Sequence, residues 1–160
     1  MATLHVTVGL PCSGKTTLAR QLEQQYSALR LTTDEWHTRL FGQDVDDQEH
    51  DRRHELVEAM LWEVAARVLV LGADVILDFG LWVRSQRDDM RLRAAQLGAD
   101  FKIHYLDATE EVLFTRLAER NAHLPQGAFR IPETKMKEYI PIFEPLFQDE
   151  LAYSCVYPQT

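Results

Sequence analysis

The chain has 160 residues, of which 46% are hydrophobic and 26% are charged, a composition typical of one globular domain and not of a disordered chain. It carries 17 Lys and Arg against 25 Asp and Glu, a formal net charge of −8, which argues against a nucleic-acid partner. No apolar run of about 18 residues is present, so we expect no membrane span. Two cysteines are too few for a disulfide framework. We therefore expect a single domain over residues 1–160, in the cytoplasm, as a monomer or homodimer.

Short apolar runs alternate with amphipathic segments along the chain. Apolar and β-branched residues predict four strands, over residues 4–8, 28–32, 75–77 and 101–106. Apolar residues at helical spacing predict helices over residues 14–26, 57–71, 85–97 and around 113–117. The tail contains several prolines, and we expect short helices there with one edge strand near residues 153–156.

Strands that alternate with helices predict an α/β fold, a three-layer sandwich. We expect a mostly parallel sheet of four or five strands with helices on both faces. Ligands bind such sheets beyond the carboxyl ends of the strands. The residues at these ends are Gly9, Asp34, Asp78 and Asp107.

The segment Gly9-Leu-Pro-Cys-Ser-Gly-Lys-Thr16 follows the first strand and precedes the first helix. It fits the pattern G-x-x-x-x-G-K-[ST], in which backbone N–H groups surround phosphate oxygens. We predict that Lys15 reaches the β- and γ-phosphates, that the Thr16 hydroxyl binds Mg²⁺, and that the start of the helix adds a positive dipole. The residues predicted to bind the nucleotide here are Gly9, Pro11, Cys12, Ser13, Gly14, Lys15, Thr16 and Thr17. The motif predicts a P-loop NTPase sandwich.

Two aspartates are candidates for the chemistry at the strand ends. Asp34 follows the second strand and is predicted to be the general base that accepts the proton of an attacking hydroxyl. The alternative is that it caps the helix that starts at Glu35. Asp78 follows the 75–77 strand, where a Walker-B acid would hold Mg²⁺; the alternative is a turn or cap residue.

Arg116 and Arg120 stand four residues apart on the helix after the fourth strand and therefore share a face. An irregular run follows them, and we predict a short helical lid over about 116–135. Its arginines would close over the γ-phosphate, so both join Asp34 and Lys15 as predicted catalytic residues. The alternative is a pair of solvated surface arginines.

The chain resembles the small P-loop kinases of the adenylate-kinase-like class, which include polynucleotide 5′-kinase domains, chloramphenicol phosphotransferase, zeta toxins and the predicted kinases of the AAA_33 type. The resemblance rests on Gly9–Thr16, Thr32–Trp36, Val75–Gly80, Tyr105–Thr109 and Leu117–Asn121. It implies that Lys15 and Thr16 contact phosphate and Mg²⁺, that Asp34 is the general base, and that Arg120 is the lid arginine. ATP as the phosphate donor is also implied by this resemblance.

An acidic segment, residues 44–51, precedes the long helix. It is either a solvated loop or a rim that attracts a cationic acceptor such as an amino sugar. His50 and His54 stand four apart at the start of this helix and could share a metal ion, although a solvated helix end is the favoured interpretation. Trp36 and Trp82 closely follow Asp34 and Asp78, and they are candidates for lining an acceptor pocket.

These patterns predict an ATP- and Mg²⁺-dependent kinase that phosphorylates a hydroxyl of a small molecule. One alternative is a nucleotide-binding regulator or slow ATPase with no acceptor. A second is a polynucleotide 5′-kinase, which the net charge disfavours. In polynucleotide kinases an arginine follows the base by three residues, and here that residue is His37.

Overall fold

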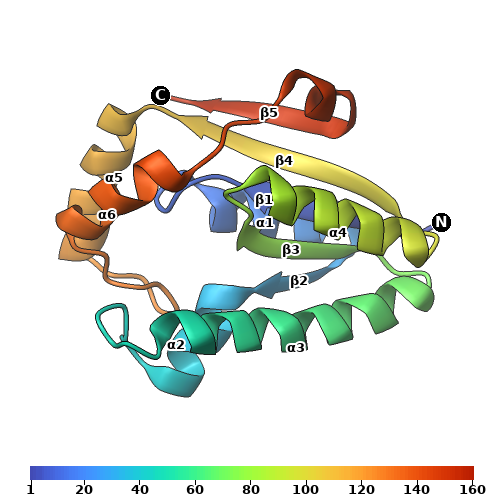
Figure 1. Cartoon of the computed structure of the whole chain (residues 1–160), viewed down its shortest axis with the longest axis horizontal. Coiled ribbons are helices and arrows are strands. Elements are labelled where there is room, and N and C mark those ends of the chain that lie inside the picture. The colour runs from blue at the N-terminus through green and yellow to red at the C-terminus, as the bar shows by residue number, and fades with distance from the viewer.

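A computed structural model describes residues 1–160 and shows one sheet of five strands flanked by helices (Figure 1). The strands are β1 (Thr3–Val8), β2 (Leu29–Thr32), β3 (Val75–Gly80), β4 (Asp100–Ala108) and β5 (Ser154–Gln159). They lie in the order β2-β3-β1-β4-β5, and all neighbouring strands are parallel. The predicted α/β sandwich is confirmed, and the edge strand expected in the tail is β5.

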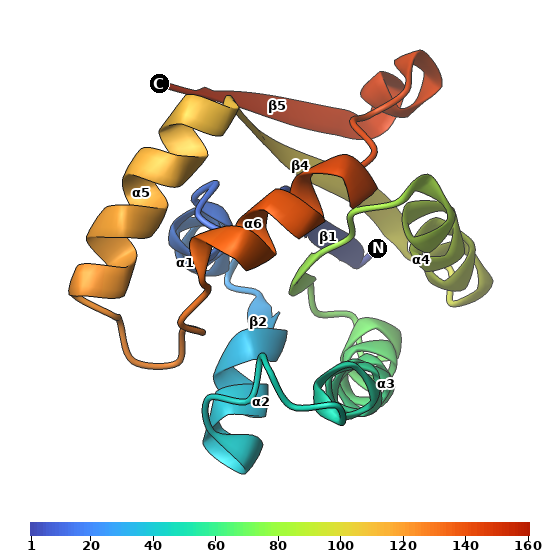
Figure 2. The same cartoon turned by 60° about the vertical axis from the view of Figure 1, so that its left-hand side comes forward.

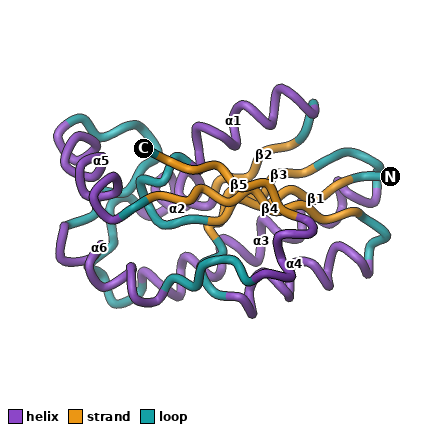
Figure 3. The backbone as a smooth tube through the Cα atoms, turned by 90° about the horizontal axis from the view of Figure 1, so that it is seen from above, coloured by secondary structure: helices purple, strands orange, loops and turns teal.

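Six α-helices connect or follow the strands. They are α1 (Lys15–Tyr26), α2 (Thr33–Phe41), α3 (His50–Val70), α4 (Arg84–Gln96), α5 (Glu110–Ala122) and α6 (Glu133–Tyr139), followed by the short 3-10 helices η1 (Ile140–Ile142) and η2 (Gln148–Tyr153). Seen along the sheet, α1 lies on one face and α3 with α4 on the other (Figure 3). None of the helices combines the length and hydrophobicity that crossing a membrane requires.

The carboxyl ends of the strands all point toward the same side of the molecule. There α2 and α5 extend beyond the sheet, and α6 crosses between α5 and α4 (Figure 2). Residues at these strand ends are therefore brought together, although they are far apart in sequence.

The largest core lies between the sheet and the helices α3 and α4. Strand residues such as Val6, Leu77 and Ile103 are fully buried in it, and the register places Val6 opposite both of the others. Helix α3 contributes a face that repeats every four residues, made of Val57, Leu61, Ala65 and Leu69. Met60 and Val64, two other apolar residues of this helix, lie outside that face and are exposed.

Two boundaries differ from the sequence predictions in a way that matters for the site. Strand β3 continues to Gly80, so Asp78 lies inside the strand and is neither a turn residue nor a helix cap. Helix α2 begins at Thr33 with Thr32 in the N-cap position, so Asp34 belongs to the first helical turn. The alternative role of Asp34 as a helix cap is therefore wrong.

A buried ion pair anchors the tail of the chain. Arg87 of α4 and Glu150 of η2 are almost completely buried, and Nε of the arginine donates to Oε1 at 2.7 Å. Arg87 also donates to the carbonyl oxygens of Leu81, Trp82 and Glu144. The guanidinium group thus joins the turn after β3 to the tail, and its hydrogen-bonding groups are well satisfied.

We expect Glu150→Ala to destabilise the fold by about 3–5 kcal/mol, because the change leaves the Arg87 charge buried without its partner. The matched control is Asp149→Ala, which removes a neighbouring carboxylate whose pair with Arg84 is exposed and should cause no resolvable change. Urea unfolding of both variants gives the comparison. Equal stabilities of the two variants would refute the anchoring role of the buried pair.

Candidate active site

A cavity of about 960 Å³ lies at the carboxyl ends of the strands, bounded by the phosphate loop and by α2, α3 and α5. Ten of the predicted site residues line it, namely Pro11, Cys12, Gly14, Lys15, Thr16, Thr17, Asp34, Asp78, Arg116 and Arg120. Gly9 and Ser13 do not line the cavity. Ser13 is buried behind the loop, and the Gly9 carbonyl accepts a hydrogen bond from the Trp82 indole at 3.1 Å.

The phosphate loop presents several backbone donors that have no acceptor in the protein. These are the N–H groups of Cys12, Gly14, Lys15, Thr16 and Thr17. Cys12 and Gly14 have φ angles of 68° and 100°, the left-handed conformations from which anion-binding backbone nests are built. A β-carbon at Gly9 would stand 2.6 Å from Ser13 Oγ and 3.2 Å from the Leu106 carbonyl oxygen, so the start of the loop has little room for a side chain. The loop is therefore suited to bind a group with several anionic oxygens.

Lys15 lies at the base of this loop. Its ammonium group donates to the carbonyl of Leu10 at 2.9 Å. Burial lowers the pKa of Lys15, while the carboxylates of Asp78 and Asp34 act in the opposite direction. The side chain therefore places a positive charge between the loop and the two aspartates.

Asp78 accepts hydrogen bonds from three threonine hydroxyls. Thr7 of β1 donates to Oδ1 at 2.8 Å, and Thr16 of α1 and Thr32 of β2 donate to Oδ2 at 2.7 and 3.0 Å. The carboxylate is buried, and the strand register pairs it with Thr32. The Thr16 hydroxyl and the Asp78 carboxylate are the hard oxygen donors that Mg²⁺ prefers, so the residues present fit this ion. Sequence reasoning missed Thr7 and Thr32, although a threonine within an apolar strand is a usable signal.

Asp34 lies in the first turn of α2, half-buried, with its side chain at the cavity. No protein group donates a hydrogen bond to its carboxylate, in contrast to Asp78. Burial raises the pKa of Asp34, and the positive charges of His54 and Lys15 act in the opposite direction. His54 of α3, for which the sequence favoured a solvated helix end over a metal ligand, is thus an electrostatic neighbour of this carboxylate. A carboxylate with free oxygens in the cavity is able to accept a proton from a bound hydroxyl.

Arg116 and Arg120 both reach the phosphate loop from α5. Arg116 donates to the Cys12 carbonyl at 3.3 Å and to Gln159 of β5 at 3.1 Å. Arg120 contacts the Cys12 sulfur at 3.5 Å and donates to the Phe129 carbonyl at 3.0 Å. The Nε–H of Arg120 is buried without a partner. The two arginines line the cavity, so the alternative of a solvated surface pair is wrong.

The predicted lid region, residues 116–135, comprises the second half of α5, a connecting loop and the start of α6. Three of its residues, Leu117, Phe129 and Ile131, form a small core together with Met136 of α6. Asn121 donates to the Ile131 carbonyl at 2.7 Å and holds the loop against the helix. On the far side the loop touches α2, since a β-carbon at Gly127 would stand 2.9 Å from Cγ of Glu35.

The wall of the cavity that α3 forms is acidic, and aromatic side chains line the cavity as well. Helix α3 supplies Asp51, Glu55 and Glu58, and aromatic side chains line the same cavity from β3, the turn after it and α6, namely Phe79, Trp82 and Tyr139. All four basic lysine and arginine residues of the cavity wall, Lys15, Arg20, Arg116 and Arg120, belong to α1 or α5. Trp82 lines the cavity, whereas Trp36 is 48% exposed and does not.

The acidic segment 44–51 is not a uniform solvated loop. Asp44 is buried and accepts hydrogen bonds from His37 at 2.8 Å, His50 at 2.7 Å and Arg53 at 3.1 Å. Burial acts to raise the pKa of Asp44, but these hydrogen bonds outweigh it and lower the pKa below the ordinary value. Of the acidic residues in the segment only Asp51 lines the cavity, so the segment as a whole is not the rim that the sequence suggested.

Several solved structures share this fold at low sequence identity. A sugar kinase from Janibacter sp. HTCC2649 is 19% identical, with 99% of this chain and 86% of that chain covered and a TM-score of 0.72. Kti12 from Chaetomium thermophilum, in complex with ADP-AlF3, is 20% identical, with 98% and 88% covered and a TM-score of 0.70. A gluconokinase from Sinorhizobium meliloti 1021 is 16% identical, with 98% and 81% covered and a TM-score of 0.63. These likenesses support the P-loop NTPase fold.

No curated protein matches this chain. A family model described as an AAA domain, AAA_33, matches residues 4–146, which include the phosphate loop, both aspartates and both arginines of the cavity. The chain therefore belongs to the AAA_33 family of AAA-domain proteins.

Proposed function

We propose that this protein is an ATP-dependent kinase that transfers the γ-phosphoryl group of ATP to a hydroxyl of a small molecule. The observation that carries the proposal is the Asp34 carboxylate, which has no protein partner and shares one cavity with the phosphate loop. The likeness to a sugar kinase, to a gluconokinase and to a protein in complex with ADP-AlF3 supports it.

Each group of the cavity has a role in this reaction. The free N–H groups of the loop and Lys15 bind the phosphate oxygens, and Arg116 and Arg120 neutralise charge on the transferring phosphoryl group. Thr16 and Asp78 would hold Mg²⁺, which supplies further charge neutralisation when bound. Asp34 orients the acceptor hydroxyl and takes its proton. Most of the rate enhancement would come from positioning and from charge stabilisation.

We further propose that the acceptor is a hydroxyl compound with an amino group, such as an amino sugar. Asp51, Glu55 and Glu58 form an acidic end of the cavity that attracts a cation and repels a sugar acid or a nucleic-acid phosphate. Trp82 and Tyr139, whose ring centroids are 4.9 Å apart, offer aromatic faces to the same cation.

Replacement of Lys15 by Met should abolish the increase in melting temperature that ATP and Mg²⁺ produce, since the loop loses the charge that faces the phosphates. Differential scanning fluorimetry of the wild type and of the variant tests this. Lys137→Met, which changes an exposed lysine of α6, is the control and should retain the full shift. If the melting temperature of Lys15→Met increased as much as that of the wild type, nucleotide binding at this loop would be refuted.

Replacement of Asp34 by Asn should lower kcat by about 10²–10⁴ and leave ATP affinity nearly unchanged, because the amide cannot accept the proton. The control is Asp46→Asn, in the exposed loop after α2, which should behave as wild type. Mass spectrometry of products from a panel of amino sugars, neutral sugars and sugar acids identifies the acceptor. Phosphate release to water with every compound would favour a slow ATPase, and full activity of Asp34→Asn would refute the base assignment.

The same carboxylate predicts the pH dependence of the reaction. Asp34 must be ionised to accept a proton, so kcat/KM should fall as the pH decreases through its pKa. Because burial raises that pKa, the acidic limb should lie above the ordinary range of an aspartate. Measurement of kcat/KM between about pH 4 and 8 tests this, and a rate that stays constant over the whole range would contradict it.

The double variant Asp51→Asn, Glu55→Gln should raise KM for a cationic acceptor by roughly fivefold per charge removed. Turnover of a neutral acceptor should be unaffected, since it makes no ion pair. Glu63→Gln, an exposed change on α3 outside the cavity, is the control. An acceptor preference for sugar acids, or an equal effect on neutral and cationic compounds, would contradict the charge argument while the kinase assignment stands.

A further inference from the structure

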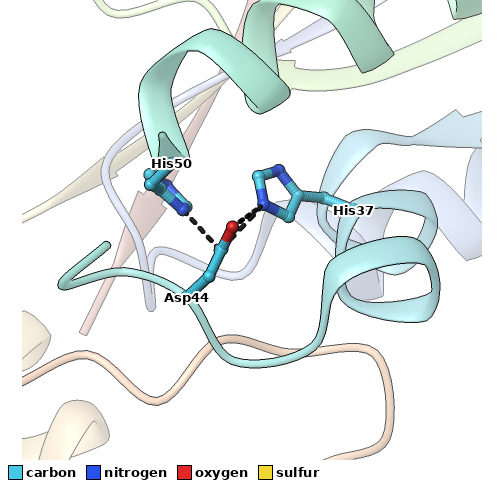
Figure 4. A group of neighbouring side chains, drawn as sticks. All are labelled: His37, Asp44 and His50. Atoms are coloured by element: carbon cyan, nitrogen blue, oxygen red, sulfur yellow. Dashed lines mark hydrogen bonds and ion pairs between the residues drawn. The ribbon is translucent and has the colours of Figure 1, made fainter. Parts of the chain in front are cut away.

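Three segments of the chain bring two histidines and an aspartate together beside the active-site cavity (Figure 4). His37 comes from α2, Asp44 from the loop that follows it and His50 from the first turn of α3. His37 Nε2 lies 2.8 Å from Asp44 Oδ1, and His50 Nδ1 lies 2.7 Å from the same oxygen. The three ligand atoms lie within 4.8 Å of one another. The protein has six histidines, and a third one, His54, also touches this cluster.

The cluster is shielded from water. The side chain of His37 is 0% exposed, that of Asp44 is 5% exposed and that of His50 is 14% exposed. Phe129 of the lid region packs edge-on against both imidazoles, with ring centroids 5.0 and 5.2 Å away. Polar groups that are buried in this way must find strong partners, because solvent cannot satisfy them.

We propose that His37, Asp44 and His50 form a binding site for a divalent transition-metal ion, with zinc favoured by the ligand set. Two imidazole nitrogens and one carboxylate oxygen are the protein ligands of one class of zinc site, in which a fourth position stays open. In a tetrahedral site, zinc bonds of about 2.0–2.1 Å place ligand atoms about 3.3–3.4 Å apart. The rings and Asp44 therefore need to separate by less than about 1 Å to admit the ion. Thr16 and Asp78 offer only oxygen, which suits Mg²⁺ instead.

The surroundings supply the outer contacts that such a site needs. His37 Nδ1 lies 3.1 Å from His54 Nδ1, which orients the ring and leaves Nε2 directed at Asp44. His54 in turn lies 3.4 Å from Glu58, and Arg53 donates to the second oxygen of Asp44. Partners of this kind fix the tautomer and orientation of metal ligands. The competing interpretation is that the same contacts form a hydrogen-bonded network that holds the loop without a metal.

A metal ion at this position would join the two helices that bound the acceptor end of the cavity. Helix α2 carries Asp34, and α3 carries Asp51 and Glu55. Coordination would fix α2, the loop and α3 to one another. The expected effect of the ion is therefore to hold these three segments together, and its binding is measurable without ATP or an acceptor.

The test uses the full chain after treatment with a chelator. Isothermal titration with Zn²⁺ should give one site per chain, and Co²⁺ should give visible d–d absorption bands when it occupies the same ligands. His50→Gln should abolish both signals. His54→Gln, which removes an outer contact, should weaken the affinity by about 10–100-fold. His123→Gln changes an exposed histidine at the end of α5 and should bind as wild type.

If His50→Gln does not fold, nitrogen NMR of wild-type protein with ¹⁵N-labelled histidines identifies the ligands instead. Zinc should shift Nε2 of His37 and Nδ1 of His50, while His5 and His104, a separate buried pair on β1 and β4, stay unchanged. Absence of binding by Zn²⁺ and Co²⁺, unchanged binding by His50→Gln, or shifts confined to other histidines would each overturn the proposal. In these cases the cluster is a metal-free hydrogen-bonded network. The proposed kinase function does not depend on the outcome.

Discussion

The carboxylate of Asp78 is the interaction on which the site depends. A buried charge in the middle of a sheet is costly unless it is fully hydrogen-bonded, and here three threonine hydroxyls from β1, β2 and the first turn of α1 surround it. The same contacts that satisfy the charge hold the start of α1 against β3. The phosphate loop, which connects β1 to α1, is thereby held at both ends, and the N–H groups of Cys12 and of residues 14–17 have no acceptor in the protein. The same hydrogen bonds therefore stabilise the sheet and preorganise the anion site.

Charge is divided between the two ends of the cavity. Lys15, Arg116 and Arg120 contact the phosphate loop, whereas carboxylates of α3 line another wall of the cavity. Asp34 of α2 stands between these regions, where Lys15 and His54 both influence its charge. Such a division favours a polyanionic donor at one end and a cationic or neutral acceptor at the other. In a kinase that binds an acidic acceptor we would expect basic residues in place of these carboxylates.

Local patterns in the sequence were sufficient to predict the fold and the phosphate loop, because glycines at fixed spacing and apolar runs act over a few residues. The placement of Asp34, Arg116 and Arg120 at one cavity also followed, since parallel strands end on one side. The hydroxyls on Asp78, the buried pair of Arg87 with Glu150, and the cluster around Asp44 were not predicted. Each of these features either joins segments that are distant in the chain or involves a residue that is buried although its sequence context suggests exposure. An acidic run, for example, gives no sign that one of its members is buried.

Helix α5 is linked to the edge strand β5 by a hydrogen bond between side chains. Gln159, in the last strand, accepts a hydrogen bond from Arg116, 43 residues earlier in the chain. The strand that carries it, β5, has only one neighbour, β4. Edge strands open locally at a lower free-energy cost than central strands, and hydrogen exchange detects such openings. The position of the Arg116 guanidinium group is thus coupled to the outermost strand, and local opening of β5 would remove one of its two hydrogen bonds without unfolding the core.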